Sequence, residues 1–283
     1  MYFVSNVPAL PSPLERLDDD RLDAAGIRMF LKRDDLIHPD FPGNKWRKLK
    51  YNIEAAGGRT VLTFGGAYSN HIAATAAAGH HFGFPTIGVI RGEECLPLNP
   101  VLARARAHGM TLHYVSRREY RDKSGLDLRA RFGDFYLIPE GGANAQGLRG
   151  CAELPAEIEM PFDILCCSAG TGVTLAGVAT ALRHDQRAIG YAALKGAGFL
   201  TDEVRRLQAS YGSPTTNWSV ETAFHFGGYA KRTAALDDFV TDFHERHGIT
   251  LNWVYEAKMM SAVFTRTAER RFPPGTTVIA LLA

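Results

Sequence analysis

The run "CCSAGTGVTLAG" has the composition of a turn that binds phosphate. It follows an apolar segment and contains Gly170, Thr171, Gly172, Val173 and Thr174. Glycines let the chain turn tightly and expose successive N–H groups, and the start of a following helix adds partial positive charge. The run lacks the Gly-Lys-Ser/Thr of a Walker A loop and the spacing of a dinucleotide fingerprint. It predicts a phosphate site, and the alternative is a simple strand-to-helix turn.

A second polar stretch, "TFGGAYSNHIAATAAAG", could bind a carboxylate. It brings Ser69, Asn70 and His71 to the end of an apolar run and the start of an alanine-rich helix. A serine or asparagine before a helix is most often a cap, and capping alone would explain one of the three. N–H groups at a helix start, together with a serine hydroxyl, suit the carboxylate of a substrate.

Lys45, in "FPGNKWRKLKYN", is a candidate for covalent chemistry. Asn44 is expected to cap a helix, which puts Lys45 in the first turn, where a cation opposes the helix dipole. That position is unfavourable unless the amine is neutral or bonded, and a lysine with a depressed pKa is what Schiff-base chemistry needs. The alternative, a solvated basic helix end, fits Lys50 better than Lys45.

The composition is that of an ordinary globular protein. The chain has 283 residues, of which 46% are hydrophobic and 22% charged, enough for one large domain or two moderate ones. A formal net charge of +2 argues against a nucleic acid or a membrane as partner. The four cysteines lack the spacing of a zinc site, so we expect no metal. Because we find no signal peptide and no run long enough to span a bilayer, we expect a cytoplasmic protein.

Strands and helices are expected to alternate along the chain. Apolar or β-branched runs predict strands at 60–64, 86–90, 111–115, 162–170, 188–194 and 276–283. Helix-like segments separate several of these runs, and this alternation predicts parallel sheets covered by helices. Ligands of such sheets bind at the carboxyl ends of the strands. The phosphate turn and the Ser69 stretch both stand at such ends.

Five segments occur in the order and at about the spacing of one known family: "IRMFLKRDDL…PGNKWRKLKYN", "TFGGAYSNH", "IPEGGANAQGLRG", "SAGTGVTLAG" and "NWVYEAKMM". The chain resembles the pyridoxal-phosphate enzymes that include 1-aminocyclopropane-1-carboxylate deaminase and D-cysteine desulfhydrase. These share the fold of the tryptophan synthase β subunit, fold type II. The resemblance implies an α/β protein of two domains, each a mainly parallel sheet flanked by helices. Residues 1–49 and 142–283 would form a larger cofactor-binding domain, and residues 50–141 a smaller domain that closes over the substrate.

The resemblance also implies which residues bind the cofactor, pyridoxal 5'-phosphate. Lys45 looks like the lysine that forms the Schiff base, and Lys48 is similar in place to a lysine near the cofactor phosphate. The turn that begins at Gly170 matches the phosphate loop. Asn70 matches an asparagine that bonds to the ring oxygen, and Glu256 resembles a glutamate that faces the pyridine nitrogen, where a carboxylate would strengthen electron withdrawal.

Other residues are implied to contact a small amino-acid substrate. Ser69 matches a serine near the substrate carboxylate that could also act as nucleophile or proton relay, with Asn70 and His71 beside it. Tyr255 resembles a tyrosine that faces the substrate, and Tyr229 is similar in position to a second active-site tyrosine. A homodimer is a further implication of the resemblance.

Three features differ from the family pattern. Pro42 replaces one of the two glycines that usually precede the Asn-Lys pair. His71 is similar to the desulfhydrase branch, whereas Glu256 is similar to the deaminase branch. The sequence ends at "TTVIALLA", where relatives continue into a His/Thr-Gly-Gly loop, so the chain is either trimmed there or differs in that wall of the site. These differences leave the reaction and the substrate open.

The leading hypothesis is therefore a pyridoxal-phosphate lyase or deaminase that acts on a small amino acid and releases ammonia and a 2-oxo acid. A pyridoxal-phosphate enzyme of a biosynthetic pathway, doing substitution or racemisation, is an alternative. An NAD-dependent oxidoreductase is a second alternative, although no acidic residue stands at the right distance after a first strand to bind a ribose. A cofactor-binding protein without catalysis is the remaining one.

Overall fold

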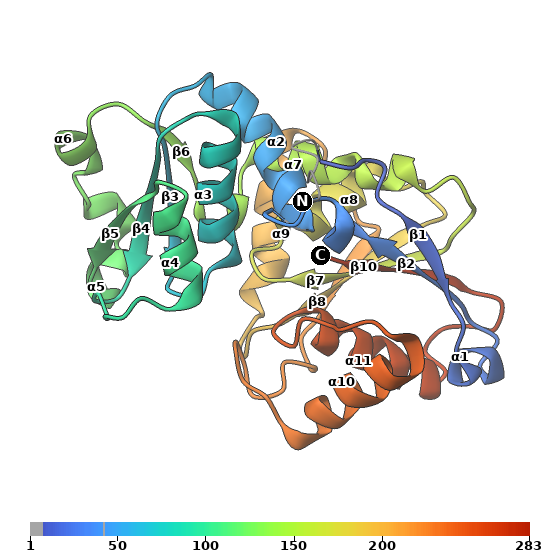
Figure 1. Ribbon diagram of the computed structural model, residues 1–283. Helices are drawn as coiled ribbons and strands as arrows, with labels where there is room; N and C mark the ends of the chain where they lie inside the picture. The colour runs from blue at the N-terminus through green and yellow to red at the C-terminus, as the bar shows by residue number, and fades with distance from the viewer. Residues whose placement is uncertain (1–7, 42) are drawn as a thin grey trace.

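The computed structural model describes residues 8–41 and 43–283, which form two separate sheets (Figure 1). The larger sheet has six strands in the order β1 (Leu14–Leu17), β2 (Arg28–Arg33), β10 (Thr277–Leu282), β7 (Ile164–Ala169), β8 (Arg187–Ala192) and β9 (Trp218–Glu221). Neighbouring strands are parallel except for β1, which runs antiparallel to β2.

The smaller sheet has four parallel strands in the order β5 (Thr111–Val115), β4 (Thr86–Arg91), β3 (Val61–Gly66) and β6 (Tyr136–Ile138). It stands beside the larger sheet in Figure 1 and is built from the middle of the chain. The predicted fold class, two mainly parallel α/β sheets flanked by helices, is confirmed.

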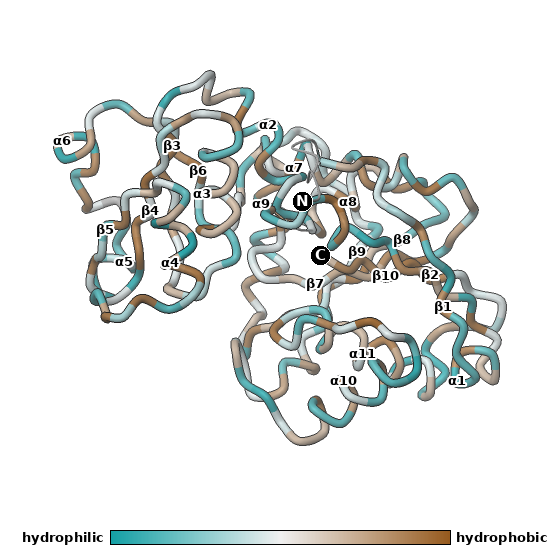
Figure 2. Tube along the Cα trace, viewed as in Figure 1, coloured by the Kyte–Doolittle hydropathy of each residue, from teal (hydrophilic) through white to brown (hydrophobic). Residues whose placement is uncertain are grey.

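Helices cover both faces of the larger sheet. One face packs against α7 (Ala145–Ala152), α8 (Val173–Ala181) and α9 (Phe199–Tyr211), and the other against α1 (Asp20–Ala24), α10 (Ala234–His247) and α11 (Glu256–Ala268). Helix α2 (Asn44–Ala56) packs on α7, and its Leu49 and Ala56 join a core on the side of the smaller sheet. Side chains along β7 alternate between the two cores: Ile164 and Cys166 join one, Leu165 and Cys167 the other. Burial on both faces explains why β7 and β10 are hydrophobic along most of their length (Figure 2).

The smaller sheet is covered in the same way by shorter elements. Helices α3 (Asn70–Phe82) and α4 (Pro100–Ala107) pack on one side, and α5 (Arg117–Arg121) and α6 (Leu128–Phe132) follow β5 toward the other. Short 3-10 helices lie between these elements: η1 (Asp34–Leu36), η2 (Lys123–Gly125), η3 (Glu140–Gly142) and η4 (Leu154–Glu157). In the part of the chain described, no helix has both the length and the apolar character needed to cross a bilayer.

Helix α2 leads from the larger sheet to the smaller one. It packs mainly on α7 and makes fewer contacts with α3. A Cβ on Gly150 would clash with the carbonyl oxygen of Arg47, so only glycine allows α7 to approach α2 this closely. The domain boundary expected at residue 50 falls within this helix, and the division into 1–49 with 142–283 and 50–141 stays a prediction.

Candidate active site

A cavity of about 1190 Å³ lies at the carboxyl ends of strands from both sheets. Its wall includes residues at or just after the ends of β3, β4 and β6 in the smaller sheet, and of β7, β8 and β10 in the larger one. This is the edge at which parallel α/β sheets bind ligands. We therefore expect the substrate and the cofactor to bind in this cavity.

The cavity brings most of the predicted site residues together. Its lining includes Lys45, Lys48, Ser69, Asn70, His71, Gly170, Thr171, Tyr229 and Tyr255. Among the residues that the structure describes, Gly172, Val173, Thr174 and Glu256 were also predicted but lie outside the lining. The lining further contains polar residues that the sequence did not single out for the site, among them Ser168 and Arg91.

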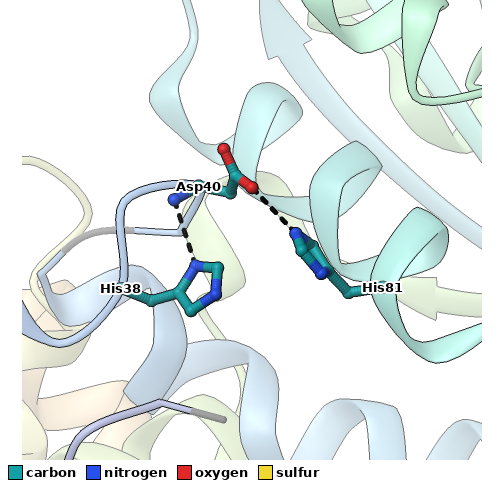
Figure 3. A group of neighbouring side chains, drawn as sticks. All are labelled: His38, Asp40 and His81. Atoms are coloured by element: carbon teal, nitrogen blue, oxygen red, sulfur yellow. Dashed lines mark hydrogen bonds and ion pairs between the residues drawn. The ribbon is translucent and has the colours of Figure 1, made fainter. Parts of the chain in front are cut away.

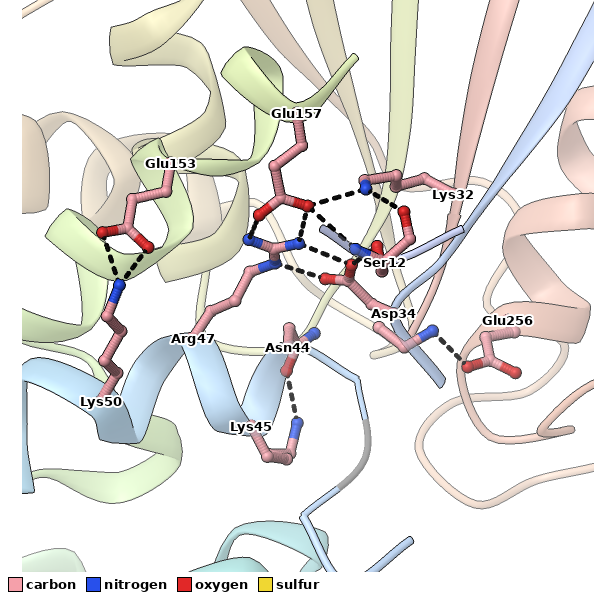
Figure 4. A network of polar contacts seen from close by, with 11 residues as sticks. Ser12, Lys32, Asp34, Asn44, Lys45, Arg47, Lys50, Glu153, Glu157 and Glu256 are labelled. Carbon is pink, nitrogen blue, oxygen red and sulfur yellow. Dashed lines mark hydrogen bonds and ion pairs between the residues drawn. The ribbon is translucent and has the colours of Figure 1, made fainter. Parts of the chain in front are cut away.

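Lys45 stands in the first turn of α2, with its amine toward the cavity. Gly43 is the N-cap, so the expectation that Asn44 caps the helix is wrong. Asn44 instead accepts a hydrogen bond from Lys45 Nζ through Oδ1 at 2.7 Å (Figure 4). Burial, and next the positive charge of Lys48, lower the pKa of Lys45 to about 7. A large share of the amine is therefore neutral and nucleophilic at neutral pH.

The turn before Lys45 is shaped by Gly43. Its φ of +64° lies in the left-handed region, and a Cβ there would clash with the backbone of Ala283. The end of β10 thus packs directly against the start of α2. Pro42, the predicted departure from the family pattern, lies outside the described residues.

His71 has a tautomer that its neighbours determine. Thr63 donates its hydroxyl proton to the carbonyl oxygen of Ile138 at 2.8 Å, so toward His71 its oxygen can only accept. The contact of 3.0 Å between His71 Nε2 and Thr63 Oγ1 is therefore a bond that Nε2 donates. Nδ1 is left as a buried acceptor with no partner in the described chain. Burial, with the charges of Lys45 and Lys48, lowers the pKa of His71 to about 3 and keeps the ring neutral.

Ser69 performs the capping role and still faces the cavity. Its Oγ accepts a hydrogen bond from the N–H of Ile72 at 3.3 Å, at the start of α3. Its own N–H donates to the carbonyl oxygen of Gly66 at 3.0 Å, which closes the turn between β3 and α3. Because the cap uses only a lone pair of Oγ, the hydroxyl proton can be donated into the cavity.

The glycine turn after β7 presents backbone rather than side chains. Gly172, with φ of +79°, is the N-cap of α8, and its position supplies no side-chain cap. The first N–H groups of α8 are thus available to an anion, as expected of a phosphate turn. Gly170 and Thr171 reach the cavity wall. Ser168, just before the turn, has a buried Oγ with no partner within the described residues.

Tyr255 and Tyr229 form a pair in the cavity wall. Their ring centroids are 5.9 Å apart with an interplanar angle of 64°. Burial, followed by the neighbouring Tyr229, raises the pKa of Tyr255 well above its ordinary value, so its phenol stays protonated. The protonated phenol is a hydrogen-bond donor at the cavity.

Glu256 is buried beside the site, but its carboxylate bonds to backbone. Oε1 accepts from the N–H of Ala283 at 2.6 Å, and Oε2 from the N–H of Asn252 at 2.9 Å. Burial raises the pKa of Glu256 to about 7 against the effect of these two bonds. The side chain joins the start of α11 to the end of β10. In this arrangement Glu256 is not among the residues of the cavity wall.

The other face of α2 carries a buried network of charges (Figure 4). Arg47 bonds to Asp34 through Nε at 2.6 Å and Nη2 at 2.8 Å, and to Glu157 through Nη1 at 2.7 Å and Nη2 at 2.9 Å. Lys32 pairs with Glu157 at 2.7 Å. Ser12 donates its hydroxyl to Asp34 at 2.7 Å. Lys45 and Lys48 thus project from a helix turn whose opposite side is held in place by the ion pairs of Arg47.

A cluster outside the cavity fixes the segment that leads to Lys45 (Figure 3). His81, near the end of α3, contacts Asp40 Oδ2 through Nε2 at 2.8 Å, and Arg104 pairs with the other oxygen of Asp40. His38 Nδ1 accepts from the N–H of Asp40 at 3.1 Å. The group therefore joins the chain before α2 to the helices of the smaller sheet.

Comparison with known proteins identifies the family. Residues 8–283 match the family described as "Pyridoxal-phosphate dependent enzyme". A putative 1-aminocyclopropane-1-carboxylate deaminase from Pyrococcus horikoshii is 30% identical over 254 residues, which cover 82% of this chain and 77% of that protein. A bifunctional D-cysteine desulfhydrase/1-aminocyclopropane-1-carboxylate deaminase, mitochondrial, from Arabidopsis thaliana is 27% identical over 88% of this chain and 69% of its own length.

The fold agrees with this match. A crystal structure of an ACC deaminase homologue is similar with a TM-score of 0.85 and 26% identity, over 99% of this chain and 90% of that one. The match sets aside the nicotinamide alternative, because the cofactor of the family is pyridoxal phosphate. With its cavity lysine, its uncapped turn at α8 and this match over residues 8–283, the chain belongs to the pyridoxal-phosphate-dependent enzymes, in the family of the 1-aminocyclopropane-1-carboxylate deaminases and D-cysteine desulfhydrases.

Proposed function

We propose that this enzyme is a lyase or deaminase that acts on a small amino acid and releases ammonia and a 2-oxo acid. The observation that carries the proposal is the amine of Lys45. Its pKa of about 7 occurs in the cavity that also contains Ser69 and Asn70, beside the turn that starts α8. The names of the related proteins, which are deaminases and desulfhydrases, support the same class of reaction.

The donors and acceptors of the cavity fit pyridoxal phosphate. The Lys45 amine would bind its aldehyde carbon. Lys48 and the N–H groups at the start of α8 would bind its phosphate, since no side chain at Gly172 caps that helix. His71 Nδ1 and Ser168 Oγ are buried polar atoms without partners in the described chain, and each needs a hydrogen bond that a polar ligand would supply.

When bound, the cofactor withdraws electrons from the α-carbon of an amino acid. The protein's part is to orient the substrate and move protons. Ser69 and Asn70, at the start of α3, would bind the α-carboxylate, because the helix N-terminus favours an anion and the hydroxyl can donate. Lys45 would carry the proton at the α-carbon, since a pKa near 7 lets it both accept and release one. Tyr255, held as a neutral phenol beside Tyr229, would donate to a leaving group.

The first test is whether the cofactor is bound through Lys45 and whether the enzyme then converts amino acids. Purified enzyme should show an absorption band near the edge of the visible range, as a lysine-bound cofactor gives, and Lys45→Ala should abolish this band. D-cysteine, 1-aminocyclopropane-1-carboxylate and a panel of D- and L-amino acids should then be assayed for keto-acid and ammonia release. Release of both from at least one of them is the expected result. Inversion or side-chain exchange without ammonia would instead favour racemisation or substitution and refute the proposal.

Three further predictions concern domain closure, assembly and location. We propose that the unit of residues 50–141 moves against the rest of the chain to close the cavity, because the lining is shared between the two sheets. Closure would exclude water from the reacting groups. A homodimer and a cytoplasmic location stay predictions from the sequence, and light scattering of the purified holoenzyme tests the first.

A further inference from the structure

The basic side chains of the cavity wall differ in whether a carboxylate pairs with them. The wall contains Lys45, Lys48, Arg91, Lys123, Arg129 and Arg206. Three of them have acidic partners: Lys123 pairs with Glu140 at 2.6 Å, Arg129 with Asp134 at 2.8 Å and Arg206 with Glu203 at 2.6 Å. Lys45 bonds to the amide oxygen of Asn44. Within residues 8–41 and 43–283, the side chains of Lys48 and Arg91 have neither a hydrogen bond nor an ion pair.

These two cations belong to opposite sides of the cavity. Lys48 is on α2, where its Cβ lies 3.0 Å from the position that a Cβ on Gly142 would take, with His71 next to it. The proposed function assigns Lys48 to the cofactor phosphate. Arg91 is the last residue of β4 in the smaller sheet and pairs in register with Gly66 of β3. One anion, on the cofactor, therefore leaves Arg91, which is exposed at the cavity wall, without a carboxylate or phosphate partner.

Arg91 lies beside the turn proposed to bind the substrate. Its Nη2 and Nε are 3.5 Å and 4.0 Å from the position of a Cβ on Gly66, so the guanidinium covers the start of that turn. The same turn continues to Ser69, whose N–H bonds to Gly66. The other packing partner of the guanidinium is the ring of Tyr120, with Cζ 5.6 Å from the centroid. The planar donors of the guanidinium match a carboxylate or a phosphate.

The cavity, with a volume of about 1190 Å³, has to hold the cofactor as well as the substrate, and part of its wall is apolar. On the side of the smaller sheet, its apolar lining includes Phe64, Leu126, Leu128, Phe135 and Leu137. An aliphatic side chain with an anionic end would place its carbons against these residues and its charge at Arg91.

We propose that Arg91 binds an anionic group on the substrate side chain, so that the preferred substrates are amino acids with a second carboxylate or a phosphate. The inference rests on the proposed function. The α-carboxylate has its own site at Ser69 and the start of α3, which leaves Arg91 for the second anion. Arg91 is thus a specificity-determining residue for this reaction.

The test uses the holoenzyme and pairs of amino acids that differ only in charge. Aspartate and asparagine, glutamate and glutamine, and O-phosphoserine and serine, in both D and L forms, are titrated while cofactor absorbance and heat of binding are recorded. At least one anionic member should bind about 10- to 100-fold more tightly than its neutral partner. A preference in the carboxylate pairs or in the phosphate pair identifies which anion the site accepts.

Arg91→Gln should abolish the preference, and Arg91→Lys should keep part of it. Arg129→Gln is the matched control, because Arg129 also lines the cavity but is paired with Asp134; it should keep the preference. Equal affinity within every pair, or equal weakening of both members by Arg91→Gln, overturns the inference and leaves the proposed function intact. A holoenzyme that responds to no amino acid overturns the proposed function, and this inference with it.

Discussion

Arg47 is the side chain on which we expect the stability of the active-site helix to depend most. It is 1% exposed and faces Asp34, which is fully buried, and Glu157. With Lys32 the group has two cations and two anions, so it is neutral. Arg47→Met would leave one buried carboxylate, Asp34, and one half-buried carboxylate, Glu157, with a single cation. Breaking a buried ion pair by removing one partner costs about 3–5 kcal/mol, because the remaining charge is not compensated.

Calorimetry and urea unfolding of the holoenzyme measure this loss. For a chain of 283 residues, it corresponds to a fall in melting temperature of roughly 5 to 8 °C. Arg47→Lys, which keeps the charge but not the paired hydrogen bonds, should lose less. Adding Asp34→Asn to Arg47→Met leaves the Lys32–Glu157 pair neutral, so the double variant should regain about 1–3 kcal/mol.

Two results would contradict the reasoning. A loss below about 1 kcal/mol for Arg47→Met would mean that solvent or local rearrangement compensates the carboxylates. Strictly additive effects of Arg47→Met and Asp34→Asn would mean that the two charges do not interact, despite bonds of 2.6 Å and 2.8 Å between them.

Three further predictions concern the lysine and the turn before it. Labelling of Lys45 in the apoprotein by pyridoxal, trapped by reduction, should increase with pH and have its midpoint near pH 7. Lys48→Gln should move that midpoint upward, because a neighbouring positive charge is lost. A wild-type midpoint near pH 10 refutes this. Because the pKa of Lys45 is lowered from 10.5, the unfolded chain binds the proton more tightly between pH 7 and 10.5. Apo Lys45→Met should therefore be more stable than wild type below pH 7, by up to roughly 5 kcal/mol, with the difference shrinking as the pH rises through that window; an unfolding difference independent of pH argues against it. Gly43→Ala should lower both the melting temperature and the cofactor content more than Gly57→Ala does. Both glycines have positive φ, but only a Cβ on Gly43 would clash with Ala283. Equal losses in the two variants would mean that backbone strain alone causes them and that the contact with Ala283 contributes nothing.

Parts of the fold could be predicted from sequence because the signal is local. Strands such as β7 and β10 are buried on both faces and so are almost continuously apolar. Strand β2 was not predicted, since its sequence "RMFLKR" carries three cations. Lys32 is tolerated inside because its amine pairs with Glu157 and donates to the carbonyl oxygen of Ser12, and Glu157 is far away in the sequence. Strand β6 has three residues, too few for a periodic pattern.

The candidate site likewise contains residues that a local sequence pattern predicts and residues that it does not. Ser69 and Lys45 were found because each stands at a strand end or helix start that can be read locally. Glu256, at the start of α11, bonds to the backbone of Ala283, which follows β10 and lies 27 residues away in the sequence, and no local pattern contains that contact. Arg91 was missed, although a cation as the last residue of the strand run "TIGVIR" was a signal that could have pointed to it.

Helix α2 explains how the chain holds a neutral lysine in place. Lys45 and Lys48 are three residues apart, so they share one face of the helix, whereas Arg47 projects from the other. Burying two amines on one turn disfavours folding, since burial lowers the pKa of both. The Arg47 network and the close contact with Gly150 stabilise that same turn from behind. The low pKa of Lys45 therefore depends on the Arg47 ion pairs on the opposite face of the helix. Weakening these ion pairs should let the turn relax toward solvent, and the pKa of Lys45 should then rise.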